Sequence, residues 1–540
     1  MKSTMMADPL SLHHVVERAK RLFPSSSVVS SMPDGTRRAH TFAQVVERAE
    51  ALALALKALG VGPGDRVATL CWNHHVHLEC YFGIPLAGAV LHTLNLRLTP
   101  QEIAWIARDG GARVAIVDDV LLPLYARIAE HHAFETIVVH SFGGEAAAAV
   151  ASGARTGIPY EALIGPHLGK PCVPPTHEEN DPVAMCYTSG TTGRPKGVVY
   201  SHRSTVLHAL VASLPDICGL SGRDRMLVFT PMFHVNAWGM PFAALMHGTR
   251  VIFPGMHLDA ERVLDLICEQ QPTIAFGVPT FWLAIRQAME RAPDRWRLPQ
   301  GMRCLAGGAP VPESLAACFA ERAVHIVPGW GMTETSPLGT LNYRSPEWAA
   351  RSSPDAPFPH TAAGIVVPLV RIRIQGAEGE LPWDGASAGE IQVRGPTITG
   401  GYQGIERDPE KHTEDGWLRT GDVGTIDSCG YLRITDRLKD MVKSGGEWIS
   451  SVALENALMG HPAVAEAAVI AVPHEKWQER PIACIVFRAG RTATPEELNG
   501  FLSASFSKWQ LPDRYEVLTE LPKTSTGKFW KLKLRERFPR

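Results

Sequence analysis

Short apolar segments alternate with helical segments through the first part of the chain, and this alternation constrains the fold more than any other feature. Typical apolar segments are "DRVATLC" (65–71) and "ARVAIVDD" (112–119). The helical pattern "TFAQVVERAEALALALKALG" (41–60) precedes the first of them, with Thr41 as a candidate N-cap and Gly60 as a candidate stop. Helices between apolar strands predict stacked α/β layers with largely parallel sheets.

The sequence pattern changes after about residue 364 from alternating helical and apolar segments to β-forming segments separated by turns, which indicates a different kind of sheet. Segments such as "VRIRIQG" (370–376) and "GEIQVRG" (389–395) are rich in β-formers and separated by turns. From about residue 439 to the end, helical and strand-like segments are mixed over the length of a small domain. We therefore expect an α/β protein with a large N-terminal domain of stacked α/β sheets, a β-rich subdomain and a small α+β C-terminal domain.

The composition excludes several broad classes of protein. Of the 540 residues, 45% are hydrophobic, and 53 Lys plus Arg balance 55 Asp plus Glu, so we expect no nucleic-acid partner. No apolar run approaches the ~18 residues of a membrane span, although peripheral contact with a membrane stays open. The ten cysteines include no C-x-x-C pair, so we expect reduced, buried thiols in a cytoplasmic protein.

The loop "YTSGTTGRPKG" (187–197) combines hydroxyl residues, glycines and a lysine after a short apolar segment. Its hydroxyls and bare backbone amides are suited to phosphate oxygens. It is not a Walker A loop, because no Ser or Thr follows Lys196. Taken alone, such a loop also fits a plain surface turn. The candidate phosphate-binding residues are Thr188, Ser189, Gly190, Thr191, Thr192 and Lys196.

Six further motifs follow this loop along the chain. They are "PMFHVNAWG" (231–239), "LAGGAP" (305–310), "GWGMTETSP" (329–337), "RTGD" (419–422), "DRLKDMVKSGGEWIS" (436–450) and "PKTSTGK" (522–528). Together with the loop they resemble the signature of the adenylate-forming superfamily, which contains acyl-CoA synthetases, peptide-synthetase adenylation domains and luciferases. The resemblance spans most of the chain. It implies a two-step ligase: a carboxylic acid and Mg²⁺·ATP give an acyl-adenylate, and CoA then displaces AMP.

The resemblance assigns residues to the metal ion and the phosphates. Thr188 and Glu334 would supply the hard oxygen ligands that Mg²⁺ prefers. Thr333 would donate to the α-phosphate and is a candidate catalytic residue. Taken without its motif, Glu334 fits an ordinary glutamate at the entry of a helix.

The nucleoside part of ATP is assigned in the same way. Asp422 would accept hydrogen bonds from both ribose hydroxyls, with Arg437 assisting, although an isolated Gly-Asp is common in plain turns. Trp330 departs from the tyrosine that many relatives carry, so base stacking should survive while a phenol hydrogen bond is lost. The residues expected to line the adenine slot are Gly308, Gly329 and Trp330.

Lys528, near the carboxyl terminus, would reach over the substrate carboxylate and the α-phosphate and stabilise the charge that develops in the transition state. A solvated surface lysine is the alternative. The resemblance places a hinge at 436–441, between an N-terminal domain (1–435) and a mobile C-terminal domain (442–540). Further contacts assigned near or beyond the hinge are Lys439, Lys443 and Trp448 for the nucleotide, and Gly445 and Gly446 for CoA.

The acid substrate is indicated by the motif at 231–239. His234 stands where relatives that activate amino acids carry an aspartate, so an α-amine would lack a counter-ion. We take His234 as a candidate catalytic residue and Trp238 as the gate of an acyl tunnel lined by Met240, Phe242 and Leu245, which also fit plain core positions. A medium- or long-chain fatty acid is favoured, with 3-methylmercaptopropionate as runner-up. The resemblance further suggests a homodimer.

Two other classes of function are weighed against this one. A regulatory protein that kept the fold without the reaction would have lost Lys528, Glu334 or Asp422, and all three are present. A metal hydrolase is suggested by the 22 histidines and by "WNHHVHLE" (72–79). That spacing puts no ligand triad on one helical face, so we expect surface histidines there instead.

Overall fold

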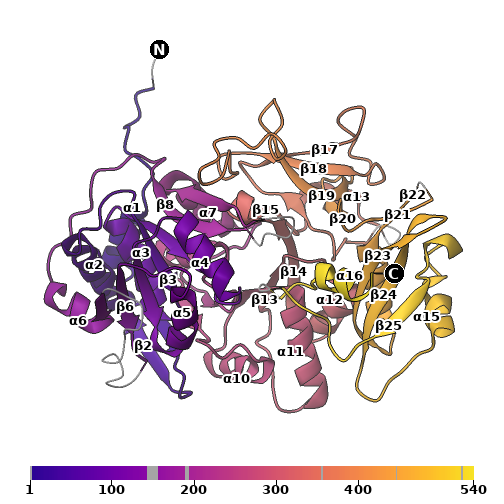
Figure 1. The fold of residues 1–540 in the computed structure, drawn as a ribbon, viewed down its shortest axis with the longest axis horizontal. Helices are drawn as coiled ribbons and strands as arrows, with labels where there is room; N and C mark the ends of the chain where they lie inside the picture. The colour runs from indigo at the N-terminus through magenta and orange to yellow at the C-terminus, as the bar shows by residue number, and fades with distance from the viewer. Residues whose placement is uncertain are drawn as a thin grey trace.

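Four β-sheets and their covering helices make up the protein in the computed structural model (Figure 1). The structure describes residues 3–142, 156–188, 194–353, 357–445, 447–524 and 527–539. The N-terminal sheets lie at one end of the molecule and the C-terminal sheet at the other, with a four-stranded sheet between and above them in Figure 1.

The seven-stranded sheet has the order β7-β6-β5-β3-β4-β8-β9. All neighbouring pairs are parallel except β8 and β9, which the loop at 187–197 connects as an antiparallel pair. Its strands are β3 (Arg66–Leu70), β4 (Val90–Thr93), β5 (Val114–Asp118), β6 (Thr136–His140), β7 (Thr156–Pro159), β8 (Pro182–Tyr187) and β9 (Gly197–Ser201).

The nine-stranded sheet has the order β16-β15-β14-β13-β12-β10-β11-β1-β2, with parallel strands in the centre and antiparallel strands at both ends. Its strands are β1 (Ser27–Ser31), β2 (Arg37–Thr41), β10 (Arg225–Leu227), β11 (Arg250–Phe253), β12 (Ile274–Gly277), β13 (Arg303–Gly307), β14 (His325–Gly331), β15 (Leu338–Leu341) and β16 (Ile365–Val366).

Helices pack on both faces of the two large sheets, so that helix and sheet layers alternate. One hydrophobic core joins the sheets through α1 (Leu12–Leu22), α2 (Phe42–Ala58), α3 (His75–Leu86), α7 (His202–Ser213) and α9 (Met240–His247). The outer faces are covered by α4 (Pro100–Asp109) and α5 (Leu122–Ala129) on one sheet, and by α10 (Ala260–Gln270), α11 (Pro279–Arg291) and α12 (Glu313–Ala320) on the other. The short helices are α6 (Tyr160–Ile164), α8 (Val235–Trp238) and α13 (Pro346–Arg351).

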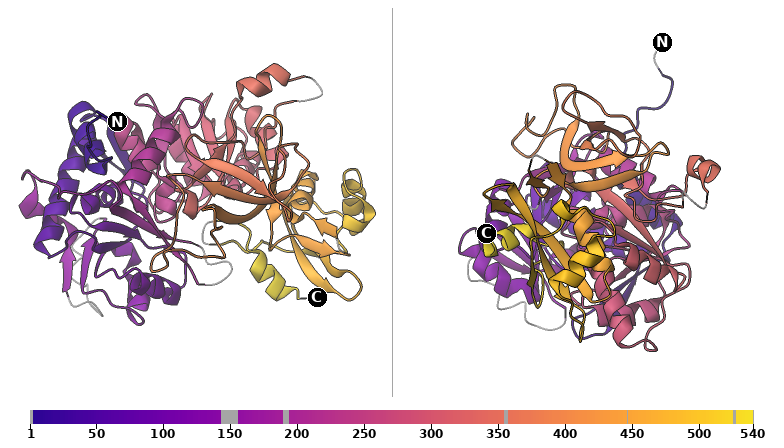
Figure 2. Two further views of the ribbon diagram at one scale, coloured as in Figure 1. Left: turned by 90° about the horizontal axis from the view of Figure 1, so that it is seen from above. Right: turned by 90° about the vertical axis from the view of Figure 1, so that its right-hand side faces the viewer.

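The last third of the chain forms two further sheets (Figure 2). The antiparallel four-stranded sheet contains β17 (Arg371–Gln375), β18 (Gly389–Arg394), β19 (Leu418–Ile426) and β20 (Leu432–Arg437). The final sheet and its helices are β21 (Val442–Ser444), β22 (Glu447–Ile449), α14 (Ser451–Gly460), β23 (Val464–His474), β24 (Gln478–Phe487), α15 (Pro495–Leu502), β25 (Arg514–Val517) and α16 (Lys531–Arg537). Core residues of α14 join those of α12, so this part packs directly on the large domain.

The expected fold class is confirmed: stacked α/β sheets are followed by a β-rich sheet and a small α+β unit. Thr41 caps α2, with Gln44 completing a capping box. All ten cysteines are free thiols, six of them buried. Among the described residues, no helix is both long and apolar enough to cross a membrane.

The histidines of "WNHHVHLE" do not lie at the surface, so that expectation was wrong. His74, His75 and His77 are buried, because every residue of α3 is buried between the sheets and His74 immediately precedes the helix. The helix is therefore enclosed on all sides, and histidine spacing along it carries no information about exposure.

Candidate active site

A cavity of about 940 Å³ lies where the seven- and nine-stranded sheets, the four-stranded sheet and the C-terminal unit meet. Thirteen of the predicted site residues line it, although they come from motifs spread over more than half of the chain. They are Thr188, Lys196, His234, Trp238, Gly308, Gly329, Trp330, Thr333, Glu334, Asp422, Arg437, Lys439 and Lys528. Four predicted phosphate-loop residues (Ser189, Gly190, Thr191 and Thr192) and Gly446 lie outside the described residues.

Asp422 accepts hydrogen bonds from two sides of the cavity. The indole Nε1 of Trp330 donates to its Oδ2 at 2.7 Å, and the Nε of Arg437 lies 3.1 Å from its Oδ1. β19 and β20 hold this arrangement, because Asp422 and Arg437 face each other in the antiparallel ladder. The indole thus supplies a donor in place of the lost phenol, and the two contacts fix the orientation of the carboxylate.

Glu334 and Thr188 fit the expected divalent cation. Glu334 lies in a buried 3₁₀ turn (Thr333–Thr335) that follows β14, and burial raises the pKa of its carboxyl. Its Oε1 accepts from the neutral hydroxyl of Tyr402 at 3.0 Å rather than from a basic residue. A buried carboxylate of this kind is stabilised by a metal cation, for which Thr188 offers a second oxygen in the same cavity.

Lys196 is held by a partner that sequence motifs did not suggest. Its ammonium group pairs with Asp408 and lies 5.1 Å from the centre of the Tyr402 ring. The neighbouring Gln403 donates its backbone N–H to the carbonyl of Gly197, which ties the phosphate loop to the segment before β19. Tyr402 and Asp408 therefore belong to the site, yet they lie more than 200 residues from the loop and carry no recognisable spacing.

Lys528 enters the cavity from the C-terminal unit. Its side chain packs against Gly308, where an added Cβ would lie 2.9 Å from the lysine Cε. The hydroxyl of Thr280 donates to the carbonyl of Gly527 at 2.7 Å and fixes the loop on the large domain. Burial lowers the pKa of Lys528 to about 8, and the positive charge of Arg437 acts in the same direction.

His234 is a neutral group beside two cations. Burial lowers the pKa of His234 to about 3, and the positive charges of Lys528 and Arg97 act in the same direction with smaller effect. The ring therefore stays uncharged at neutral pH. The cations that disfavour imidazolium favour an anion in the same place. This part of the cavity is therefore suited to a carboxylate and unsuited to an ammonium group.

The gate candidate Trp238 is the last residue of a short segment, α8, with left-handed backbone conformation. The four residues of α8 have φ angles of 46°, 50°, 49° and 58°, and Gly239 follows at 69°. Left-handed backbone costs roughly 1–2 kcal/mol per non-glycine residue, so the surrounding structure must impose it. Strain of this kind is concentrated at functional positions. The Trp238 ring lies against Gly307, where an added Cβ would come within 3.3 Å of it.

The apolar part of the cavity wall differs in two residues from the sequence expectation. Met240 lies in the wall, but Phe242 and Leu245 are buried core residues, so their assignment to the tunnel was wrong. Phe242 instead packs on the rings of α3. His208 is a polar member of this wall whose Nε2 has no hydrogen-bond partner among the described residues. Other apolar wall residues include Ala212, Cys218, Val235, Phe276, Leu305, Leu338 and Leu341.

Three predicted contacts are not part of the cavity wall as described. Lys443 and Trp448 face each other on the hairpin of β21 and β22, with the lysine Nζ 5.4 Å from the indole centre. Gly445, at the tip of that hairpin, has φ 62° and donates its N–H to the carbonyl of Trp477. In this arrangement Lys528 occupies the cavity and the hairpin lies away from it.

The fold and the cavity define a nucleotide-binding enzyme with a C-terminal unit that contributes to the site. The chain belongs to the AMP-binding enzyme family: the family matches residues 16–403, and the AMP-binding enzyme C-terminal domain matches residues 453–528. The expected superfamily membership is thereby confirmed.

Relatives of known activity agree with this assignment. A long-chain-fatty-acid–CoA ligase of Thermus thermophilus is 46% identical over 99% of this chain and 97% of its own. A 3-methylmercaptopropionyl-CoA ligase of Ruegeria pomeroyi is 40% identical over 100% and 99%. Among solved structures, an anthranilate CoA ligase in complex with anthranoyl-AMP has a TM-score of 0.86 at 27% identity, with 99% of each chain covered.

Proposed function

We propose that the protein is an ATP-dependent acyl-CoA synthetase that activates a carboxylic acid as its acyl-adenylate and transfers the acyl group to CoA. The observation that carries this proposal is the position of Lys528. Its ammonium group shares one cavity with the neutral His234 and with the Asp422 carboxylate, although it comes from a different part of the chain.

In the first half-reaction, a carboxylate oxygen of the acid attacks the α-phosphorus of ATP. The new O–P bond forms as the bond to the β-phosphate oxygen breaks, and pyrophosphate leaves. Asp422 orients the ribose, and Thr333 donates to the α-phosphate. Lys528 stabilises the negative charge that develops on the α-phosphate in the transition state, which makes it the principal catalytic group.

Thr188 and Glu334 would hold Mg²⁺ at the phosphates. The bound ion supplies charge neutralisation for the pyrophosphate leaving group. Glu334 suits this role because its carboxylate is buried and hydrogen-bonded to a neutral phenol rather than to a basic side chain.

In the second half-reaction, the CoA thiolate attacks the acyl carbon and AMP leaves with the electrons of the acyl–oxygen bond. We place a hinge at 436–441 between an N-terminal domain (1–435) and a C-terminal domain (442–540). Rotation there would withdraw Lys528 and bring the hairpin with Lys443, Gly445 and Trp448 to the cavity. Lys439→Pro should therefore impair thioester formation more than adenylation, whereas Lys439→Ala should affect both to a similar extent.

The acid is proposed to be a medium- or long-chain fatty acid, with 3-methylmercaptopropionate as the second candidate. The apolar wall around Trp238 and Met240 suits an alkyl chain. One relative named for each of the two acids aligns over nearly the whole chain. We further propose a homodimer in the cytoplasm, which sedimentation equilibrium and cell fractionation would test.

A panel of acids tests the function. Release of AMP should be followed with acids from acetate to palmitate, with 3-methylmercaptopropionate and with benzoate, in the presence and absence of CoA. The proposal requires AMP release that depends on both acid and CoA. Absence of acid-dependent turnover across the panel with Mg²⁺·ATP would overturn it.

A further inference from the structure

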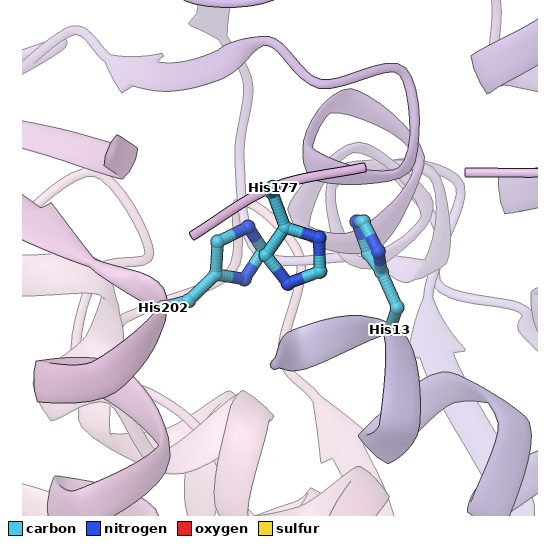
Figure 3. A group of neighbouring side chains, drawn as sticks. All are labelled: His13, His177 and His202. Atoms are coloured by element: carbon cyan, nitrogen blue, oxygen red, sulfur yellow. The ribbon is translucent and has the colours of Figure 1, made fainter. Parts of the chain in front are cut away.

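Three histidines from distant parts of the chain meet on the large domain (Figure 3). His13 lies in the first turn of α1, His177 in the segment that precedes β8, and His202 is the first residue of α7. None of the three is part of the active-site cavity wall, so the proposed reaction assigns them no role. We refer to these residues as the histidine cluster.

The rings of the histidine cluster are close enough to share one ion. Their centroids are 4.5 Å apart for His13 and His177, 5.1 Å for His13 and His202, and 4.2 Å for His177 and His202. One ring nitrogen of each residue lies within 4.8 Å of the corresponding nitrogens of the other two. Nitrogen ligands about 2.0–2.1 Å from a tetrahedral zinc ion are separated by about 3.4 Å, so small ring rotations would close the site.

Two of the rings are oriented by hydrogen bonds that leave a lone pair free. The Nε2 of His13 lies 3.1 Å from the carbonyl of Pro85 and can only donate to it, which leaves Nδ1 unprotonated in the neutral ring. The Nδ1 of His177 lies 3.4 Å from the carbonyl of Pro175 and donates in the same way. The remaining Nε2 of His177 is buried without a hydrogen-bond partner among the described residues. Metal-binding histidines commonly donate their second nitrogen to a carbonyl in this manner.

We propose that the histidine cluster binds a divalent transition-metal ion of the zinc type, with water as the fourth ligand. Three imidazoles without a carboxylate select a borderline ion such as Zn²⁺ over Mg²⁺ or Ca²⁺, which require oxygen ligands. The site is therefore chemically distinct from the cation site at the ATP phosphates.

Protons compete weakly for the ligand nitrogens. Burial lowers the pKa of His13 to about 4 and that of His202 to about 3, and the neighbouring rings act in the same direction. These two rings are neutral near pH 7, which is the form that binds metal.

His202 is the ligand that must rearrange. Its Nδ1 accepts the backbone N–H of Leu12 at 3.2 Å, so in the neutral ring Nε2 carries the proton. The ring can bind an ion through Nδ1 only when the contact with Leu12 is released. We therefore expect loss of His202 to weaken binding less than loss of His177.

The ion would fasten the N-terminal helix to the domain. α1 is already joined to its neighbours by core packing of Leu12, Val15 and Val16, by the hydrogen bond from Arg18 to the carbonyl of Met246, and by the ion pair of Lys20 with Glu50 at 2.8 Å. Metal binding would add a link between α1, α7 and the segment before β8. A second group, Cys71, His74 and Asp118, is a weaker candidate, because His74 already donates to Asp118 at 2.9 Å and burial raises the pKa of the thiol.

The test uses tag-free, full-length protein dialysed against EDTA, with Zn²⁺ as the only added ligand. Competition against a chromophoric chelator and metal analysis after gel filtration should give one ion per chain. His177→Ala should weaken binding at least about 10-fold, and His13→Ala similarly. His131→Ala, at an exposed histidine outside the histidine cluster, should match the wild type.

Two further measurements separate metal binding from general damage. Circular dichroism and adenylation activity establish that each variant folds, and bound Co²⁺ should show the intense visible bands of a four-coordinate site in the wild type only. Added Zn²⁺ should also raise the melting temperature of the wild type and not of His177→Ala. The proposal would be overturned if the wild type bound no Zn²⁺. It would also be overturned if the folded variants His177→Ala and His13→Ala bound Zn²⁺ with the affinity of the wild type.

Discussion

Replacement of Lys528 by alanine should separate the two half-reactions of this enzyme. We expect the rate of adenylation to fall by about 10²- to 10³-fold, because a positioned cation that acts on developing charge contributes roughly 3–4 kcal/mol. Thioester formation from a supplied acyl-adenylate should remain within about threefold of the wild type, because the lysine would act only in the first step.

The structure supports an effect of this size. Burial and the nearby Arg437 lower the pKa of Lys528 from 10.5 to about 8, so the ammonium form is about 3 kcal/mol less favourable in the free enzyme than in water, although it still predominates at pH 7. The same exclusion of water strengthens the attraction between the ammonium group and the phosphate and carboxylate charges of the substrates.

Single-turnover assays measure the two steps independently. Pyrophosphate release without CoA reports adenylation, and acyl-CoA formation from synthetic acyl-adenylate reports the second step. Lys523→Ala is the matched control, because Lys523 belongs to the same loop and pairs with Glu466 at 2.7 Å outside the cavity wall. Adenylation by Lys528→Ala at more than a third of the control rate, or equal losses in both steps, would refute the reasoning.

A pH profile of the wild type gives a second readout of the same group. In the proposed mechanism the protonated form of Lys528 is the active form, and its folded-state pKa of about 8 is lowered relative to an ordinary lysine. The kcat/KM for adenylation should therefore fall as the pH rises through about 8, with the Lys528→Arg variant losing this limb. A profile that stays flat up to pH 9.5 would contradict the assignment.

Three further substitutions test other parts of the molecule. Trp330→Phe removes the indole donor to Asp422 and should raise the KM for ATP about 10-fold without changing that of the acid, as measured by initial rates. His208→Leu removes a ring from the apolar wall whose Nε2 has no hydrogen-bond partner among the described residues, and it should raise kcat/KM for long-chain relative to short-chain acids about 10-fold, in competition assays. Lys531→Met leaves buried Glu455 without its partner at 2.7 Å, which should cost about 3 kcal/mol of stability in thermal unfolding; adding Glu455→Gln should restore much of it.

Local patterns were sufficient for most of the fold. The alternation of apolar and helical segments predicted the layered sheets, and Thr41 was found as the cap of α2 because capping depends on a few adjacent residues. Most of the site residues that were predicted from the ordered motifs line one cavity. These features are encoded within short stretches, where residue type and spacing are informative.

Long-range features were missed for a physical reason. The hydrogen bond between Trp330 and Asp422 joins residues 92 positions apart, and Lys196 reaches an aspartate 212 positions away. The burial of α3 was also missed, because a helix enclosed on all sides shows no periodicity that would reveal its histidines as interior. The left-handed backbone of α8 has no sequence signature, since three of its four residues disfavour it.

In the proposed mechanism, the carboxylate of Asp422 connects the nucleotide to the hinge. Arg437 ends β20 within the proposed hinge, and it shares this carboxylate with Trp330 and, in the proposed reaction, with the sugar. A rotation that displaces Arg437 changes the charge that the sugar hydroxyls encounter. By thermodynamic reciprocity, AMP must then have different affinities in the two orientations, and its occupancy must bias their populations by the same factor. The release of AMP and the rotation of the C-terminal domain are therefore thermodynamically coupled.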